Sequence, residues 1–199
     1  TPMLFVANPK AGIKSLGDLI AHAKAKPDEL TLGSPSRGSV PHLSGELLEQ
    51  FTGVRLRNVP MGTSGQAIQS VVGGDTQVSV DGIAPLLPLV KAGRMQALAV
   101  TSRDVLPGLE GLPLAKDTVP EMVLSGWFML FAGKGTPAAR VRALNEAVNA
   151  ALKSPQLIQK LQVSATYPVG GSVQDARSFL VREKKLWAGA DQKAGLQAE

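Results

Sequence analysis

The sequence predicts an α/β fold built around a largely parallel β-sheet. In its first half, short aliphatic segments that read as strands alternate with segments whose apolar residues recur at helical spacing. Aromatic residues make up only 4% of the chain against 44% for all hydrophobic residues, so small and aliphatic side chains supply the packing. Strands that alternate with helices in this way are typical of βα units, whose strands run parallel.

The first βα unit begins at the start of the chain. Leu4–Asn8 has the apolar run of a buried strand. Ser15, with Asp18 three residues later, resembles a capping box and predicts the start of a helix. Pro27 ends that helix, and Glu29–Gly33 predicts a second strand.

The following units continue this alternation. Ser34–Pro41 reads as a loop, and the helix after it ends at Gly53. Further strands are expected at Val54–Val59, Gln77–Ile83 and Met95–Thr101, separated by a helix that ends at Gly73–Gly74 and by a helix over Pro85–Ala92.

The last third of the chain has a different character. Residues 102–124 are rich in Pro and Gly and predict irregular structure, and Ser125–Gly133 is apolar enough to predict a strand. Three helical stretches follow, starting near Pro137, Pro155 and Ser172. Helices with apolar stripes need a surface to cover, and this third has too few strands for a sheet of its own. We therefore expect part of a second lobe to lie outside this chain.

Composition and motifs argue against several function classes. The chain has no cysteine, which excludes disulfides, thiolate metal sites and thiol nucleophiles. His22 and His42 lack the spacing of a metal site, and neither a GxSxG elbow nor a phosphate-binding or dinucleotide-binding glycine motif is present. The net charge of +5 is scattered and suits an anionic ligand better than a nucleic acid. We expect no enzyme activity, no cofactor and no metal.

Three loops occupy the position where α/β sheets bind ligands, between the end of a strand and the start of a helix. They are Ser34–Ser39, Pro60–Ser64 and Asp81–Ala84. Helix starts present unpaired N–H groups and a partial positive charge, so they hold anions without a cationic side chain. The hydroxyl and glycine residues that would shape this site are Ser36, Gly38, Ser39, Thr63 and Ser64. The alternative is that the Ser and Thr residues only cap their helices.

Three other residues have two interpretations each. Arg37 either pairs with a ligand carboxylate or faces solvent. His42 either touches the ligand or packs beside the first loop. Asp81, at the end of an apolar strand, either accepts a hydrogen bond from a ligand or caps the next helix. His22, among alanines and lysines, is expected on the surface.

At these positions the sequence resembles the solute-binding receptors of tripartite tricarboxylate transporters, also called Bug proteins. The resemblance covers nearly the whole chain and rests on pieces such as KSLGDLI, NVP, KAGRMQALAVTS and SGWF, in order and at family spacing. It implies a periplasmic-binding-protein-like (type II) two-lobed α/β fold that closes on a small carboxylate. Residues 5–127 would be the complete ligand-binding lobe (domain 2), and residues 128–199 the mostly helical C-terminal part of the other lobe (domain 1), whose N-terminal part is missing here.

The resemblance also implies a set of ligand-binding residues. The first family motif maps onto Ser36, Gly38, Ser39 and His42, the second onto Pro60, Met61, Gly62, Thr63 and Ser64, and a cleft aspartate onto Asp81. The chain departs from the family where the second motif usually has His, Tyr and Lys, and at Pro35–Ser36, where the first usually has Ser-Gly. A Gly-rich N-terminal loop of the family is absent.

The resemblance implies a periplasmic receptor that delivers its ligand to membrane transporter subunits. Its ligand would be a di- or tricarboxylate, an amino acid or an aromatic acid. A second hypothesis is the ligand-sensing effector domain of a transcriptional regulator, which shares this architecture. A third, an enzyme on the same scaffold, has no nucleophile or base constellation to support it.

Overall fold

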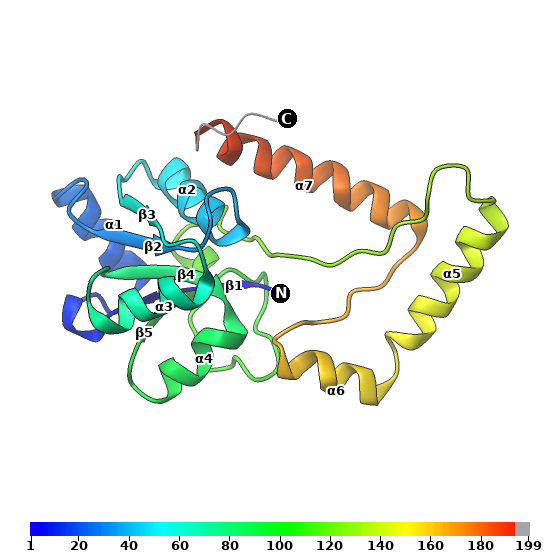
Figure 1. Ribbon diagram of the computed structural model, residues 1–199, viewed down its shortest axis with the longest axis horizontal. Coiled ribbons are helices and arrows are strands. Elements are labelled where there is room, and N and C mark those ends of the chain that lie inside the picture. Colours follow the sequence, from blue (N-terminus) through cyan, green and yellow to red (C-terminus); the bar gives the residue numbers. More distant parts are fainter. Residues whose placement is uncertain (194–199) are drawn as a thin grey trace.

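All five strands lie in one sheet at one end of the molecule. The computed structural model describes residues 1–193 and shows an α/β body from which a helical extension projects (Figure 1). The strands are β1 (Met3–Ala7), β2 (Thr31–Ser34), β3 (Arg57–Pro60), β4 (Val78–Gly82) and β5 (Gln96–Val100). The helices of the body are α1 (Leu16–Ala25), α2 (Val40–Thr52), α3 (Ser64–Gly73) and α4 (Ile83–Lys91). Short 3₁₀ turns occupy Pro9–Ala11 and Ala115–Asp117.

The sheet has the order β3-β2-β4-β1-β5, and one strand runs against the others. β2 pairs in parallel with β3 and with β4, as the sequence predicts. β1, however, pairs antiparallel with both β4 and β5, so the sheet is mixed. Met3 therefore lies opposite Gly82. This reversal brings the start of β1 to the edge of the sheet where β2, β3 and β4 end.

The sheet separates two apolar layers. α1 and α2 cover one face, and α3 and α4 cover the other (Figure 1). Successive side chains of a strand point to opposite faces of the sheet, so the residues of β1 are divided between the two layers. Met3, Phe5 and Ala7 pack toward α1 and α2, whereas Leu4 and Val6 pack toward α3 and α4. All five residues are buried, so β1 contributes to both layers at once.

α1, α2 and α3 begin and end close to where the sequence predicts, but α4 begins at Ile83, two residues before the predicted Pro85. The loop predicted at Asp81–Ala84 is therefore wrong, because β4 runs directly into α4. The Ser15 hydroxyl accepts from the Asp18 N–H at 3.0 Å, and Ser39 and Thr63 cap α2 and α3 in the same way. α2 and α3 end at Gly53 and Gly74, both in the left-handed conformation that glycine adopts without steric cost.

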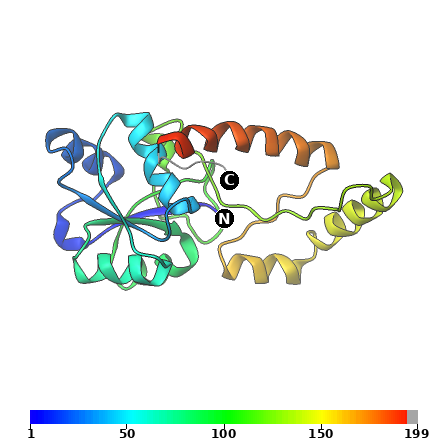
Figure 2. The same cartoon turned by 45° about the horizontal axis from the view of Figure 1, so that its top comes forward.

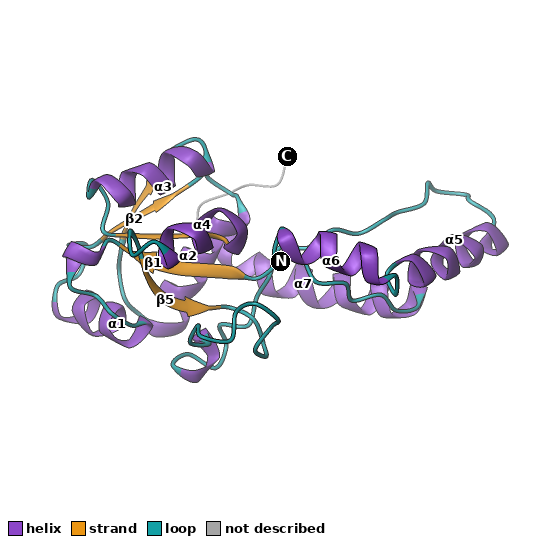
Figure 3. Ribbon diagram, turned by 90° about the horizontal axis from the view of Figure 1, so that it is seen from below, coloured by secondary structure: helices purple, strands orange, loops and turns teal. Residues whose placement is uncertain are grey.

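The extension contains only helices and loops in its described residues (Figure 3). It comprises α5 (Ala138–Ala151), α6 (Pro155–Val163) and most of α7 (Val173–Lys193). The three helices agree with the sequence prediction, but the strand expected at Ser125–Gly133 is wrong. Only Ser125 forms a bridge, to Pro2, and the rest is extended chain. A strand needs a neighbour for its N–H and C=O groups, and no described strand lies beside this segment.

The C-terminal end of α7 returns to the body and lies beside α2 (Figure 2). Ala190, Leu186 and Trp187 join the apolar layer formed by α1 and α2. One carboxylate also ties α7 to the segment that leaves the body. Glu183 Oε2 accepts from the indole N–H groups of Trp127 and Trp187, both at 2.9 Å. The outgoing segment and the returning helix are thus fixed to each other where they meet the body.

Two leucines in helices test which part of the molecule carries its stability. Leu48 of α2 is fully buried, whereas Leu144 of α5 is 58% exposed. We expect Leu48→Ala to lower the free energy of unfolding by about 2–5 kcal/mol, because it leaves a cavity in the core. We expect Leu144→Ala to change it by less than about 0.5 kcal/mol. Urea denaturation of both variants measures the difference, and equal losses would contradict this assignment of the core.

Candidate ligand-binding site

Three helix starts meet at the edge of the sheet where β2, β3 and β4 end. α2 and α3 begin a few residues after the strands that precede them, whereas α4 begins at Ile83, directly after Gly82 ends β4. The loops are joined by hydrogen bonds: the Ser36 hydroxyl donates to the carbonyl of Gly62 at 3.3 Å, and the Met61 N–H donates to the carbonyl of Ser34 at 2.8 Å. The first two predicted loops are therefore direct neighbours.

Asp81, near the end of β4, connects the second loop to the start of α4. Its Oδ2 accepts from the Ser64 hydroxyl at 2.5 Å, and its Oδ1 accepts from the Gly82 N–H at 2.7 Å. Asp81 is 8% exposed, so its carboxylate is largely desolvated and depends on these donors. It holds the start of α3 beside the start of α4.

The starts of α2 and α3 differ in the N–H groups that they offer. In α2, Pro41 has no N–H, and the His42 N–H donates to the Ser39 hydroxyl at 3.4 Å. The Val40 N–H is therefore the one that this helix start offers to a ligand. In α3, the N–H groups of Ser64 and Gly65 have no partner among the described residues, while that of Gln66 donates to the Thr63 hydroxyl. Such unpaired groups at a helix start attract an anion.

A cleft of about 300 Å³ opens beside the starts of α2 and α4. The residues that line it are Thr1, Met3, Val40, Pro41, Asp81, Gly82, Gly126, Trp127 and Phe128. Of the predicted site residues only Asp81 lines the cleft. Val40, Pro41 and Gly82 are neighbours of predicted residues, whereas Met3 and Trp127 come from segments outside the three loops. Met3 lies at the cleft because β1 runs antiparallel to β4. The alternation of apolar segments in the sequence does not reveal the direction of a strand.

The other predicted residues surround the helix starts. Ser36, Arg37 and Gly38 are exposed in the first loop, and Ser39 is half-buried as the cap of α2. In the second loop, Pro60, Gly62 and Thr63 are exposed, and Met61 and Ser64 are half-buried. Ser39 and Thr63 act as helix caps, because each hydroxyl oxygen accepts from a backbone N–H of its own helix.

His42 is buried inside α2, at 4% exposure, and not in the cleft. Its Nδ1 accepts from the Gly38 N–H at 3.4 Å. Burial lowers the pKa of the His42 imidazole below its ordinary 6.5, and the nearby Arg37 charge lowers it further, whereas Glu49 opposes both. His22, by contrast, is half-buried on α1 and contacts Glu29 at 3.0 Å.

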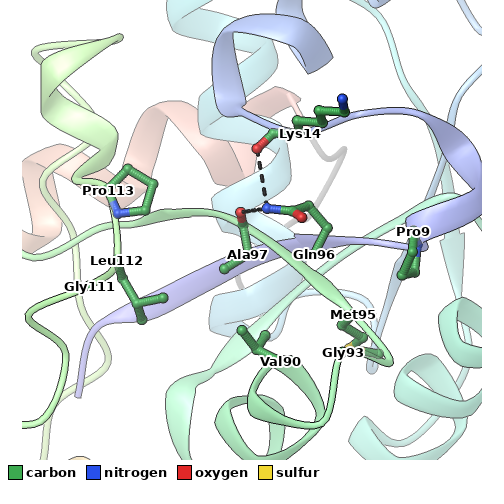
Figure 4. Close-up of a pocket in the computed structure, with 10 residues that line it drawn as sticks. All are labelled: Pro9, Lys14, Val90, Gly93, Met95, Gln96, Ala97, Gly111, Leu112 and Pro113. Carbon is green, nitrogen blue, oxygen red and sulfur yellow. Dashed lines mark hydrogen bonds between the residues drawn. The ribbon is translucent and has the colours of Figure 1, made fainter.

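A larger cavity of about 520 Å³ lies at the other edge of the sheet (Figure 4). Its main polar side chain, Gln96, already donates to the carbonyls of Lys14 and Ala97, at 3.3 and 2.9 Å. The amino group of Lys14 extends away from the other lining residues in Figure 4. No α-helix starts among the lining residues, and the short 3₁₀ turn at Pro9 has its Lys10 N–H bonded to Asn8, so this cavity lacks the features that hold an anion.

Two further findings concern residues 1–193. Within them no three or more His, Asp or Glu side chains are grouped as a metal site would require. None of their helices combines the length and apolar character of a membrane span.

An α/β body with its cleft at the carboxyl ends of parallel strands has the architecture of a ligand-binding protein. The chain belongs to the TctC family, described as tripartite tricarboxylate transporter family receptor, which matches residues 1–196. It is 32% identical to Protein BugT of Bordetella pertussis over 195 residues, which are 98% of this chain and 60% of BugT.

Solved structures share the fold. One described as R. palustris Rpa4515 with adipate superposes with a TM-score of 0.81 at 33% identity, over 98% of this chain and 65% of that protein. MatC from Rhodopseudomonas palustris with bound malate gives a TM-score of 0.70 at 25% identity, with the same coverage. The chain thus spans about three-fifths of these proteins. This coverage agrees with the expectation that one of two lobes is incomplete here.

Gly38 tests the shape of the first loop. Its φ of +79° is left-handed, so we expect Gly38→Ala to cost about 1 kcal/mol of stability and to displace the loop. Gly65→Ala, in the first turn of α3, is the control, because a Cβ at Gly65 meets no atom within 4 Å. Thermal unfolding of both variants measures the difference. If Gly38→Ala is as stable as Gly65→Ala, the loop does not depend on this conformation.

His42 predicts how stability depends on pH. Its pKa is lowered in the folded state, so the unfolded chain binds a proton more readily. Stability should therefore fall as the pH drops from about 7 through 6.5 toward 5, before most carboxylates titrate. His42→Asn should reduce this loss, and His22→Asn should preserve it. Urea denaturation at pH 7 and pH 5 checks both, and an equal acid loss in His42→Asn and wild type would contradict the assignment.

Proposed function

We propose that this chain is the ligand-binding part of a periplasmic receptor that captures a small carboxylate and delivers it to a tripartite tricarboxylate-type membrane transporter. One observation carries the proposal: a cleft at the carboxyl edge of the sheet is lined by the start of α2, where the Val40 N–H has no partner among the described residues, and by Gly82 at the start of α4. Membership of a family of transporter receptors supports this cellular role and a periplasmic location. The family description favours this role over that of a regulator's effector domain.

The ligand class follows from the walls of the cleft. Met3, Val40, Trp127 and Phe128 are apolar and suit a short hydrocarbon chain, while the helix starts suit its carboxylate. The related structures described with adipate and with malate fit this combination. Ser36, Gly38, Ser39 and Pro60–Ser64 shape the helix starts, and Arg37 adds positive charge at the rim.

We assign residues 5–127 to one lobe and 128–199 to the other, with the ligand enclosed by hinge closure. The C-terminal end of α7 is an exception, because Leu186, Trp187 and Ala190 pack into the core of the first lobe. The extended chain after Trp127 leaves the body, which supports the boundary (Figure 1). A receptor of this kind releases its ligand unchanged. It needs no catalytic residue, cofactor or nucleic-acid partner.

Calorimetric titration of the purified chain with adipate and malate tests the proposal. Adipamide is the matched control, because it keeps the carbon chain of adipate and removes both charges. We expect heat of binding for at least one acid and none for adipamide. Equal affinity for adipate and adipamide, or no binding to any acid, would overturn the anion clamp in this chain.

Asp81 is proposed to select acids that carry a hydrogen-bond donor, since its carboxylate lines the cleft. Asp81→Asn removes a charge that repels carboxylates and weakens an acceptor for a hydroxyl group. We expect malate to bind about tenfold more weakly relative to adipate, an energy of about 1.4 kcal/mol. Asp75→Asn, an exposed site with the same charge change, is the control. If Asp81→Asn changes both affinities by the same factor, Asp81 does not discriminate between them.

A further inference from the structure

His42 lies beneath the first loop without reaching the cleft. It is the third residue of α2, in the first turn of the helix, and its ring is almost completely buried. Nδ1 accepts from the Gly38 N–H at 3.4 Å, so that nitrogen carries no proton. Nε2 faces the Glu46 carboxylate at 3.8 Å. The ring therefore has its proton on the side of Glu46 and its lone pair on the side of the loop.

The contacts continue from Glu46 to the second loop. Glu46 Oε1 accepts from the Asn58 side-chain amide at 2.7 Å, and the same amide donates to Glu49 at 3.3 Å. Glu49 also accepts from the Leu56 N–H at 3.2 Å. Asn58 belongs to β3, two residues before the second loop begins at Pro60. A buried polar chain thus links Gly38 of the first loop to the strand that carries the second.

The loop that His42 holds controls the start of α2. Gly38 has a left-handed backbone, and the next two residues are the cap Ser39 and Val40, whose N–H has no partner among residues 1–193. Ser36, two residues before Gly38, donates to Gly62 of the second loop. A loop that moves at Gly38 would change both the direction of the Val40 N–H and the contact between the loops.

We propose that His42 is a positioning residue for the ligand loop: by accepting the Gly38 N–H with an unprotonated Nδ1, it holds the first loop in the shape that binds an anion. This inference rests on the proposed function. A proton on Nδ1 would set its N–H against the N–H of Gly38, and two donors that face each other cannot form a hydrogen bond, so the loop would be released. The charged groups that face the ring are Arg37, which opposes its protonation, and Glu46 and Glu49 of the same helix. Ligand binding is thereby weakened by acid.

Two substitutions separate positioning from packing. His42→Asn keeps an acceptor close to the place of Nδ1 and cannot titrate, whereas His42→Leu fills similar space without an acceptor. His22→Asn is the control, because it removes the other histidine and leaves the first loop unchanged. The first readout needs no ligand: hydrogen exchange of the Gly38 amide, measured by NMR. We expect slow exchange in wild type and His42→Asn, and faster exchange in His42→Leu.

The second readout is affinity for adipate and malate at pH 7 and pH 5.5. We expect His42→Leu to bind about tenfold more weakly at pH 7, as for the loss of one hydrogen bond, and His42→Asn to bind like wild type. The loss of affinity between pH 7 and pH 5.5 should be smaller in His42→Asn than in wild type and in His22→Asn. Titration of the ligand itself affects all three proteins equally. Should His42→Leu not fold, this pH comparison still decides.

Two results would overturn the proposal. Gly38 exchange that is the same in His42→Leu and wild type would show that the ring does not hold the loop. Weak binding in His42→Asn with Gly38 still protected would show that His42 contacts the ligand directly. If wild type binds neither acid, the proposed function fails for this chain, while the exchange measurement still decides whether His42 holds Gly38.

Discussion

The position of β1 in the centre of the sheet is the constraint on which the remaining structure depends. Every residue of β1 is buried, and the strand pairs antiparallel with both neighbours. Its alternate side chains enter the two apolar layers, so the helices on both faces pack against the same five residues. Its direction places Met3 beside Gly82, where the cleft opens. The strand that stabilises the core thus also shapes the binding site.

The binding site forms where the packing of the core places the starts of three helices at one edge of the sheet. Helices α2, α3 and α4 must begin at one edge because β2, β3 and β4 run parallel and end there. Side chains satisfy some of the first N–H groups, at His42 and Gln66, and leave others for a ligand. Selectivity can then come from Asp81, an acceptor among donors, rather than from cationic side chains.

Much of this arrangement could be predicted from the sequence, because local signals determine it. The capping box at Ser15, the glycines that end α2 and α3, and the polar loops after β2 and β3 agree with the structure. The direction of β1 could not be predicted, because an apolar strand of five residues reads the same in either direction. Trp127 was not predicted to line the cleft, because it lies in the segment after Ser125, outside the three predicted loops. The expected strand at Ser125–Gly133 failed because a strand depends on a partner that its own residues do not supply.

The central claim is that unpaired N–H groups at the helix starts bind the anion. Amide chemical shifts of the isotopically labelled chain, recorded during titration with adipate and with malate, test it most directly. The account predicts that the largest shifts occur at Val40, Ser64 and Gly65, and that adipamide leaves these amides unchanged. Shifts centred on the cavity around Gln96, or shifts of equal size with adipamide, would contradict it.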